Sequence, residues 1–302
     1  MPGLLQVVFD ALSLGSLYAM GALGIALIFG VMRLVNFAHG DVIAFCAFAL
    51  LSPDAVAIVF AGNLPWFLLV PFVLAMGAGL SVLLEMVVFR RFRRANPATM
   101  MIASFALGFV IRYGLLTLFS SRPKSISLLP ALSQPIEIFG ARIPLLQLIT
   151  ILVTVGVLFG LTVFLRRTRF GLEMRAAAEN FTMARMLGVR ANRVITIAFA
   201  LSGALAGAIA IILGSQTGTA NIAMGANVML MAFIATVIGG MGSLTGAVAA
   251  GFLLGSLATV LQAVLPPDAR VFRDAFVYGL VILVLIFRPQ GLFSAQGAKE
   301  RV

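Results

Sequence analysis

Two short runs hold most of the side chains that could act chemically in this 302-residue sequence. The first is Asn36-Phe-Ala-His-Gly-Asp41, and the second is Gly239-Gly-Met-Gly-Ser-Leu-Thr-Gly246. Both interrupt apolar sequence, and glycine lets a backbone leave a helix there. Irregular backbone within a membrane is tolerated where it is buried in protein or lines a wet cavity, so its free polar groups can replace water around a solute. We predict a solute pathway at these residues: Asn36, His39, Asp41, Gly239, Gly240, Gly242 and Ser243.

Close helix packing is the alternative explanation for the glycines. Pairs such as Gly203 with Gly207 and Gly251 with Gly255 have the spacing of small residues that lets two helices approach closely. Packing is the better interpretation for these later glycines. For Asn36 to Asp41 and for Ser243, a solute pathway is the better interpretation. We expect His39 to be a neutral, hydrogen-bonded histidine rather than a proton relay.

No reaction chemistry is apparent elsewhere in the chain. A P-loop ATPase needs a lysine after a glycine-rich loop, and neither Lys124 nor Lys299 follows one. We find no metal-ligand cluster and no pair of nucleophile and base, so we expect no enzyme activity, metal or cofactor in this chain.

Two further charges lie within apolar runs: Glu85 is expected to snorkel toward the nearby arginines, and Arg112 to serve in a helix-facing pair or an interface.

The composition indicates a membrane protein. Apolar residues make up 62% of the chain and charged residues 10%, against about 25% charged in soluble domains. So few polar side chains exclude a soluble enzyme or a nucleic-acid-binding protein, despite the net charge of +11. The single Cys46 allows no intramolecular disulfide. A cleavable signal peptide carries basic residues before its apolar stretch, and no lysine or arginine precedes the first apolar run here.

The apolar runs predict an all-α, polytopic bundle of transmembrane helices, which we interpret as one transmembrane domain over residues 1–302. The runs cover residues 4–31, 35–52, 64–89, 99–121, 144–165, 194–214, 226–241, 243–265 and 272–288. Only Met32 to Leu34 separate the first two runs, and only Gly242 separates the seventh from the eighth. At both places the sequence fits a discontinuous helix as well as a true turn between two helices, so the predicted number of spans is eight or nine.

Basic residues predict the orientation, because they concentrate in cytoplasmic loops. Fifteen fall on one side of the predicted spans: Arg33, Arg90, Arg91, Arg93, Arg94, Arg166, Arg167, Arg169, Arg175, Arg185, Arg190, Arg193, Arg288, Lys299 and Arg301. Five fall on the other: Arg122, Lys124, Arg142, Arg270 and Arg273. We expect the N-terminus outside, the C-terminus in the cytoplasm, segment 166–193 in the cytoplasm and loop 122–143 outside, as a connector or a docking surface for a soluble partner.

Segment 166–193 contains a stretch of good helix formers, Glu173 to Gly188, without glycine or proline before Gly188. We predict one cytoplasmic helix that ends near Gly188. A helical period places four apolar residues on one face: Ala177, Phe181, Ala184 and Leu187. This stripe could lie on the membrane surface, where arginines would face anionic lipid, or dock on a cytoplasmic motor domain.

Several motifs occur together in a specific order. They are Gly15-Ser-Leu-Tyr-Ala19, Asn36-Phe-Ala-His-Gly40, Ala177-Ala-Glu-Asn180 with Leu187-Gly188, Gly239-Gly-Met-Gly-Ser243 with Gly246-Ala247, and Arg288-Pro-Gln-Gly-Leu292. With these motifs the chain resembles, over essentially its whole length, the LivH-type permease subunits of branched-chain amino acid ABC importers.

The resemblance implies an inner-membrane permease that pairs with a homologous second permease, two cytoplasmic ATP-binding subunits that bind ATP and magnesium, and a periplasmic substrate-binding protein. It places ATPase coupling at these residues: Arg175, Ala178, Glu179, Phe181, Ala184, Leu187 and Gly188. Asn180 departs from the acidic residue expected there. Related importers carry urea, short amides or aromatic acids. From the residues alone, a proton-coupled carrier and a passive channel for small neutral solutes are the alternatives from other classes.

Overall fold

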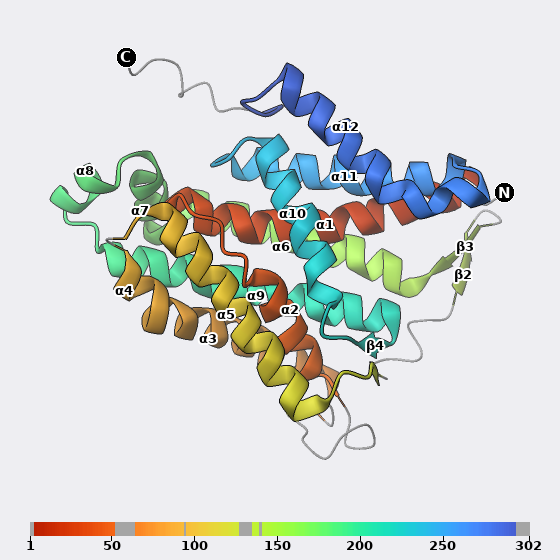
Figure 1. Cartoon of the computed structure of the whole chain (residues 1–302), viewed down its shortest axis with the longest axis horizontal. Helices are drawn as coiled ribbons and strands as arrows, with labels where there is room; N and C mark the ends of the chain where they lie inside the picture. The colour runs from red at the N-terminus through yellow and green to blue at the C-terminus, as the bar shows by residue number, and fades with distance from the viewer. Residues whose placement is uncertain (1–2, 52–63, 94, 127–134, 139–140, 294–302) are drawn as a thin grey trace. The chain divides into compact units, whose positions relative to one another are not determined.

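The computed structural model describes residues 3–51, 64–93, 95–126, 135–138 and 141–293 (Figure 1). The described residues are mostly helical, and the expected all-α membrane protein is confirmed. The helices are α1 (Leu4–Met32), α2 (His39–Phe48), α3 (Trp66–Leu84), the π-helix η1 (Glu85–Phe89), α4 (Arg90–Phe92), α5 (Pro97–Phe119), α6 (Leu145–Arg167), α7 (Arg169–Glu179), α8 (Phe181–Met186), α9 (Ala191–Thr217), α10 (Met224–Gly239), α11 (Leu244–Val264), the 3₁₀ helix η3 (Pro267–Phe272) and α12 (Arg273–Phe287).

Four short strands complete the described fold. They are β1 (Lys124–Ser125), β2 (Pro135–Ile138), β3 (Ala141–Pro144) and β4 (Thr219–Ala220). Strand β1 pairs antiparallel with β4, with Lys124 opposite Ala220, and β2 pairs antiparallel with β3, with Ile136 opposite Ile143. The predicted loop 122–143 therefore contains strands, and part of it lies outside the described residues.

Six helices in the described ranges are long and apolar enough to cross a membrane. They are Leu4–Met32, Trp66–Phe92, Pro97–Phe119, Leu145–Arg167, Asn192–Thr217 and Leu244–Val264. The predicted runs 35–52 and 226–241 correspond to shorter helices, α2 and α10. With 10 residues, α2 rises only about 15 Å, which is half of a typical hydrocarbon core.

The chain divides into two compact units, and each is described by itself. Unit 1 comprises Met1–Ala26, Pro130–Leu158 and Leu230–Val302, and unit 2 comprises Leu27–Leu129 and Phe159–Met229. The boundaries fall within α1, α6 and α10, so these three helices contribute to both units.

Glycines let α1 and α11 approach closely in unit 1. A Cβ atom on Gly251 would lie 2.6 Å from the Cα atom of Ala19, and one on Gly255 would clash with the backbone of Gly15. The packing predicted for Gly251 and Gly255 is therefore confirmed. Unit 1 also contains a polar contact between α6 and α1, in which Gln147 Nε2 donates to Asp10 Oδ1 at 2.7 Å.

Unit 2 is built around α9, which packs against both α3 and α2. The contact of α3 with α9 depends on glycine, because a Cβ atom on either Gly77 or Gly203 would clash with the carbonyl group of the other. Helix α2 lies against α9, α5 and α3, and nine of its ten residues are buried. Within unit 2, α4, α7 and α8 lie at one end and the β1–β4 pair at the other (Figure 1).

Candidate functional site

The first predicted break separates α1 from α2. Helix α1 ends at Met32, the chain is irregular over residues 33–38, and α2 begins at His39. Arg33 has a φ of 56°, in the left-handed region that favours glycine. The α-helical backbone of α1 therefore ends directly before this residue. Asn36 closes the turn before α2, since its Oδ1 accepts the Ala38 N–H at 3.1 Å. The predicted break is confirmed, and it belongs to unit 2.

His39 is fully buried at the first turn of α2. Its Nδ1 lies 3.3 Å from the Ser202 hydroxyl of α9, which ties the break to the central helix of unit 2. Its Nε2 is also buried, and no residue in the described part of the chain forms a hydrogen bond with it. Gly40 follows, where a Cβ atom would lie 2.9 Å from the carbonyl oxygen of Gly225 at the start of α10.

A polar stripe on α5 holds the break from another side. Ser104, Gly108 and Arg112 are spaced by four residues and therefore share one face of the helix. The Ser104 hydroxyl accepts the Phe37 N–H at 3.2 Å. Arg112 Nε donates to Asp41 Oδ1 at 3.0 Å, and Arg112 Nη2 lies 3.0 Å from the same oxygen in an ion pair. Because an isolated charge at a helix centre costs about 3 kcal/mol on insertion, the pairing of Asp41 with Arg112 relieves part of that cost.

The second predicted break lies in unit 1, between α10 and α11. Gly240 and Gly242 have φ values of 94° and 101°, so glycine suits both positions of this turn. Ser243 caps α11, because its hydroxyl accepts the Gly246 N–H at 3.1 Å. A Cβ atom on Gly239 would clash with Gly246, which confirms close packing at that pair.

The Arg288-to-Leu292 motif folds against this second break. The Leu292 N–H donates to the Ile238 carbonyl oxygen at 2.6 Å. Gly291 has a φ of 86°, and a Cβ atom there would lie 2.7 Å from that same oxygen. The motif therefore closes the C-terminal end of α10 within unit 1.

The predicted single helix over Glu173 to Gly188 is wrong, because the structure divides it into α7 and α8 at Asn180. Asn180 has an extended backbone, and its Oδ1 accepts the Met183 N–H at 3.0 Å, so it ends one helix and caps the next. The predicted end at Gly188 is confirmed. Gly188 has a φ of 88° and, with Val189, donates to the last turn of α8 in a glycine C-cap.

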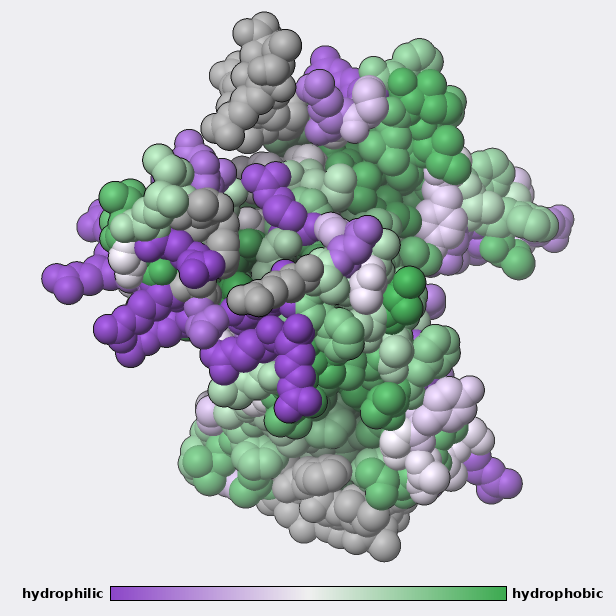
Figure 2. Space-filling view, turned by 60° about the vertical axis from the view of Figure 1, so that its left-hand side comes forward, coloured by the Kyte–Doolittle hydropathy of each residue, from purple (hydrophilic) through white to green (hydrophobic). Residues whose placement is uncertain are grey.

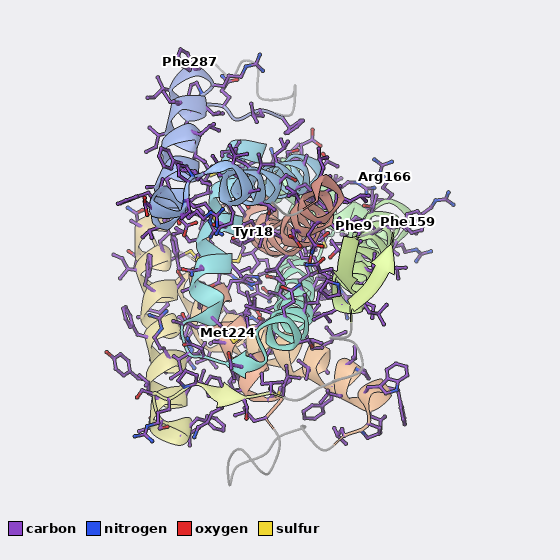
Figure 3. All side chains as sticks on the ribbon, turned by 90° about the vertical axis from the view of Figure 1, so that its right-hand side faces the viewer. Phe9, Tyr18, Phe159, Arg166, Met224 and Phe287 are labelled. Atoms are coloured by element: carbon purple, nitrogen blue, oxygen red, sulfur yellow. The ribbon has the colours of Figure 1, made fainter. Side chains whose placement is uncertain are left out.

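The predicted apolar stripe is only partly buried. Ala177 and Ala184 are 3% and 4% exposed, whereas Leu187 is 84% exposed because the helix has ended before it. Among the other predicted coupling residues, Arg175 and Glu179 are exposed. Figure 2 brings this end of unit 2 forward, where hydrophilic residues gather between hydrophobic ones, and Figure 3 shows Arg166 extending away from the ribbon.

Two polar contacts join segment 166–193 to the rest of unit 2. Arg33 Nη2 donates to the Ala178 carbonyl oxygen of α7 at 3.1 Å, so the first residue of the break contacts the predicted coupling segment. Arg93, at the end of α4, forms a hydrogen bond with Asn192 at the start of α9. Arg33, Arg93 and segment 166–193 therefore lie at the same end of unit 2, as their charges predicted.

Glu85 does not snorkel, which corrects the expectation for this residue. It begins the π-helix η1 and is fully buried. Its carboxylate forms an ion pair with Arg93 and accepts a hydrogen bond from Thr196 Oγ1 at 3.0 Å. One carboxylate oxygen pairs with Arg93 and the other accepts from Thr196 of α9, so both oxygens have partners without reaching water.

Sequence reasoning therefore located Asn36, His39 and Asp41, which the structure brings together at one break. It did not identify Ser104 and Ser202, hydroxyls in long apolar helices that nothing in the sequence distinguishes from packing serines. The helix-facing pair expected for Arg112 is confirmed, with Asp41 as its partner.

Comparison with known proteins places the chain in a family. A family model described as "Branched-chain amino acid transport system / permease component" matches residues 7–285. The chain belongs to this permease family. The permease is 34% identical over 303 residues to the high-affinity branched-chain amino acid transport system permease protein BraD of Pseudomonas aeruginosa, covering 96% of this chain and 95% of BraD.

Other relatives extend the comparison. The permease is 30% identical over 301 residues to LivH, the high-affinity branched-chain amino acid transport system permease protein of Escherichia coli strain K12, across 96% of this chain and 95% of LivH. It is also 33% identical over 143 residues to the autoinducer 2 import system permease protein LsrC of Klebsiella pneumoniae, across 45% of this chain and 41% of LsrC. No solved structure matches it significantly.

Proposed function

We propose that the permease forms one half of the membrane channel of an ATP-driven importer that moves branched-chain amino acids into the cytoplasm. The observation that carries this proposal is the nearly full-length similarity to BraD and LivH, both permeases of high-affinity branched-chain amino acid systems. The permease acts as a single domain in the cytoplasmic membrane. Its partners are a homologous second permease, two cytoplasmic ATP-binding subunits and a periplasmic substrate-binding protein.

The break at residues 33–38 is the part of this permease that we assign to the solute pathway. Asn36, His39 and Asp41 are polar and buried at the end of a half-length helix, and His39 Nε2 has no hydrogen-bond partner among the described residues. Within unit 1, the turn formed by Gly239, Gly240, Gly242 and Ser243 is a separate candidate for the pathway. The contact of Arg33 with α7 supports a coupling role for segment 166–193, since it joins that segment directly to the break.

Uptake by the reconstituted complex tests the proposed function. The permease is purified with its partner subunits, placed in vesicles with ATP on the side of the ATP-binding subunits, and given radiolabelled leucine with the binding protein. We expect ATP-dependent leucine uptake that unlabelled isoleucine and valine suppress. Suppression by urea, short amides or aromatic acids, with no effect of isoleucine or valine, would assign the same machine another cargo.

The orientation can be tested with two exposed arginines of unit 2. Arg122 follows α5 and Arg169 begins α7, and α5 alone spans about 34 Å over its 23 residues. A cysteine replacing Arg122 should react with an impermeant thiol reagent added outside intact cells, and one replacing Arg169 only after the membrane is opened. The native Cys46 is buried and should not react with the reagent. The reverse pattern would reject the proposed topology.

A further inference from the structure

The ion pair between Asp41 and Arg112 has a geometry that leaves donor and acceptor groups unused. Two nitrogens of Arg112 converge on one oxygen, Asp41 Oδ1, instead of forming two parallel bonds with both carboxylate oxygens. The guanidinium fork therefore remains suited to a second carboxylate. Asp41 Oδ2 lies against Gly108, where any Cβ atom would clash with it. Glycine at position 108 thus makes room for this carboxylate.

The pair lies at the edge of an exposed face of α5. The Arg112 side chain is 37% exposed, whereas that of Asp41 is 9% exposed. A guanidinium group facing lipid is costly, and charged residues within membrane spans face protein or water instead. This side of α5 is therefore not a plain lipid-facing surface. Two aromatic rings flank the pair: Phe109 lies 5.7 Å from the guanidinium carbon, and Phe105 stacks on Phe37 of the break.

We propose that Asp41 and Arg112 form a subsite that binds a zwitterionic amino acid during transport. Arg112 takes the α-carboxylate, and Asp41 takes the α-ammonium group. This inference rests on the proposed function and names the groups of the substrate that the pathway recognises. The exchange replaces one ion pair by two, so neither Asp41 nor Arg112 is left without a charged partner. Exposed apolar surface on Phe105 and Phe109 suits a branched aliphatic side chain beside the pair.

Paired charge removal distinguishes this role from a purely structural ion pair. Asp41→Asn and Arg112→Gln, alone and together, are compared in the complete complex in vesicles. If the subsite binds the zwitterion, leucine uptake falls at least about tenfold in the double variant, because both charge contacts to the substrate are lost. Subunit assembly, measured by copurification, should persist. If the pair serves only the fold, the double variant has no unpaired charge and transports like the unmodified complex, which would overturn the proposal.

Thiol accessibility provides a readout that does not depend on the uptake rate. Phe109 lies beside Arg112 on α5, whereas Val110 is 69% exposed and points about 160° away from Arg112. A cysteine at position 109 should react with a water-soluble, charged thiol reagent, and excess leucine with the binding protein and ATP should slow that reaction. A cysteine at position 110 should react slowly and without leucine protection. Equal reactivity at the two positions would overturn the assignment of the Phe109 face of α5 to the solute pathway.

The two proposals fail differently in these experiments. An unmodified complex that takes up no branched-chain amino acid contradicts the proposed function, and with it the zwitterion subsite. An unmodified complex with normal leucine uptake, together with a fully active double variant, contradicts the subsite alone.

Discussion

A Gly77→Val variant is expected to lose most of its folded permease, whereas Gly79→Val is expected to retain it. Both glycines belong to α3, two residues apart, so substitution by valine changes the intrinsic helix propensity by the same amount at both positions. A Cβ atom at Gly77 would clash with the Gly203 carbonyl oxygen of α9 and would lie 3.0 Å from the sulfur of Cys46 on α2. Apart from its chain neighbours and the backbone of α3 itself, no atom in the described part of the chain lies within 4 Å of the corresponding position at Gly79.

The expected loss at position 77 is large because the obstructing atoms belong to backbone. Overpacking a core typically costs about 1–3 kcal/mol when side chains can adjust, and two helix backbones can separate only by giving up their other contacts. Thermal unfolding of the detergent-purified permease, followed by size-exclusion chromatography, should show a lower midpoint and aggregated protein for Gly77→Val. Gly79→Val should elute as the unmodified protein does. Similar midpoints for the two variants would mean that α3 and α9 do not depend on this contact.

Local chemistry explains the parts of the fold that the sequence predicted well. The long apolar helices follow from uninterrupted apolar runs, and the end of α8 follows from Gly188, which adopts a positive φ at little cost. The break before His39 was predictable because Asn36 and Gly40 interrupt an apolar run. Small-residue spacing likewise predicted the close packing of Gly251 and Gly255 against α1.

The predictions that failed concern partners distant in the sequence. Glu85 was expected to reach water because arginines follow it, but its carboxylate also accepts a bond from Thr196, 111 positions away. The division of α7 from α8 depends on Asn180, whose side chain caps a helix only once the backbone has turned. Helix propensity alone predicted that one helix continues through Asn180, because propensity does not take account of a side chain that caps a new helix within a helix-forming stretch.

The partial burial of α8 changes which residues are expected to dock on an ATP-binding subunit. Ala184 is turned into the permease itself, whereas Met183, Met186 and Leu187 are 57%, 78% and 84% exposed. Arginines at positions 185 and 190 lie nearby and are exposed as well. An apolar anchor bordered by basic residues is typical of the centre of a protein interface. We therefore expect Met186 and Leu187, rather than Ala184, to seat in the ATP-binding subunit.

A Met186→Glu variant should consequently separate from the ATP-binding subunits while keeping its own fold. A buried anchor is worth about 2 kcal/mol or more, so affinity should fall at least about thirtyfold, and leucine uptake should be lost with it. Copurification on a tagged permease measures the loss, and the thermal midpoint of the permease alone checks the fold. Met186→Leu, which keeps an apolar side chain of similar size, serves as the matched control and should bind normally.

Ala184→Glu should give the opposite pattern, because a charge buried within the permease destabilises the segment before any partner is involved. Its thermal midpoint should fall even in the absence of the ATP-binding subunits. If Met186→Glu instead copurified with those subunits as well as Met186→Leu did, and lost only its association with anionic vesicles, α8 would be a helix that lies on the membrane surface. Docking on the motor would then have to be assigned to exposed residues of α7, of which Leu172 is 61% exposed.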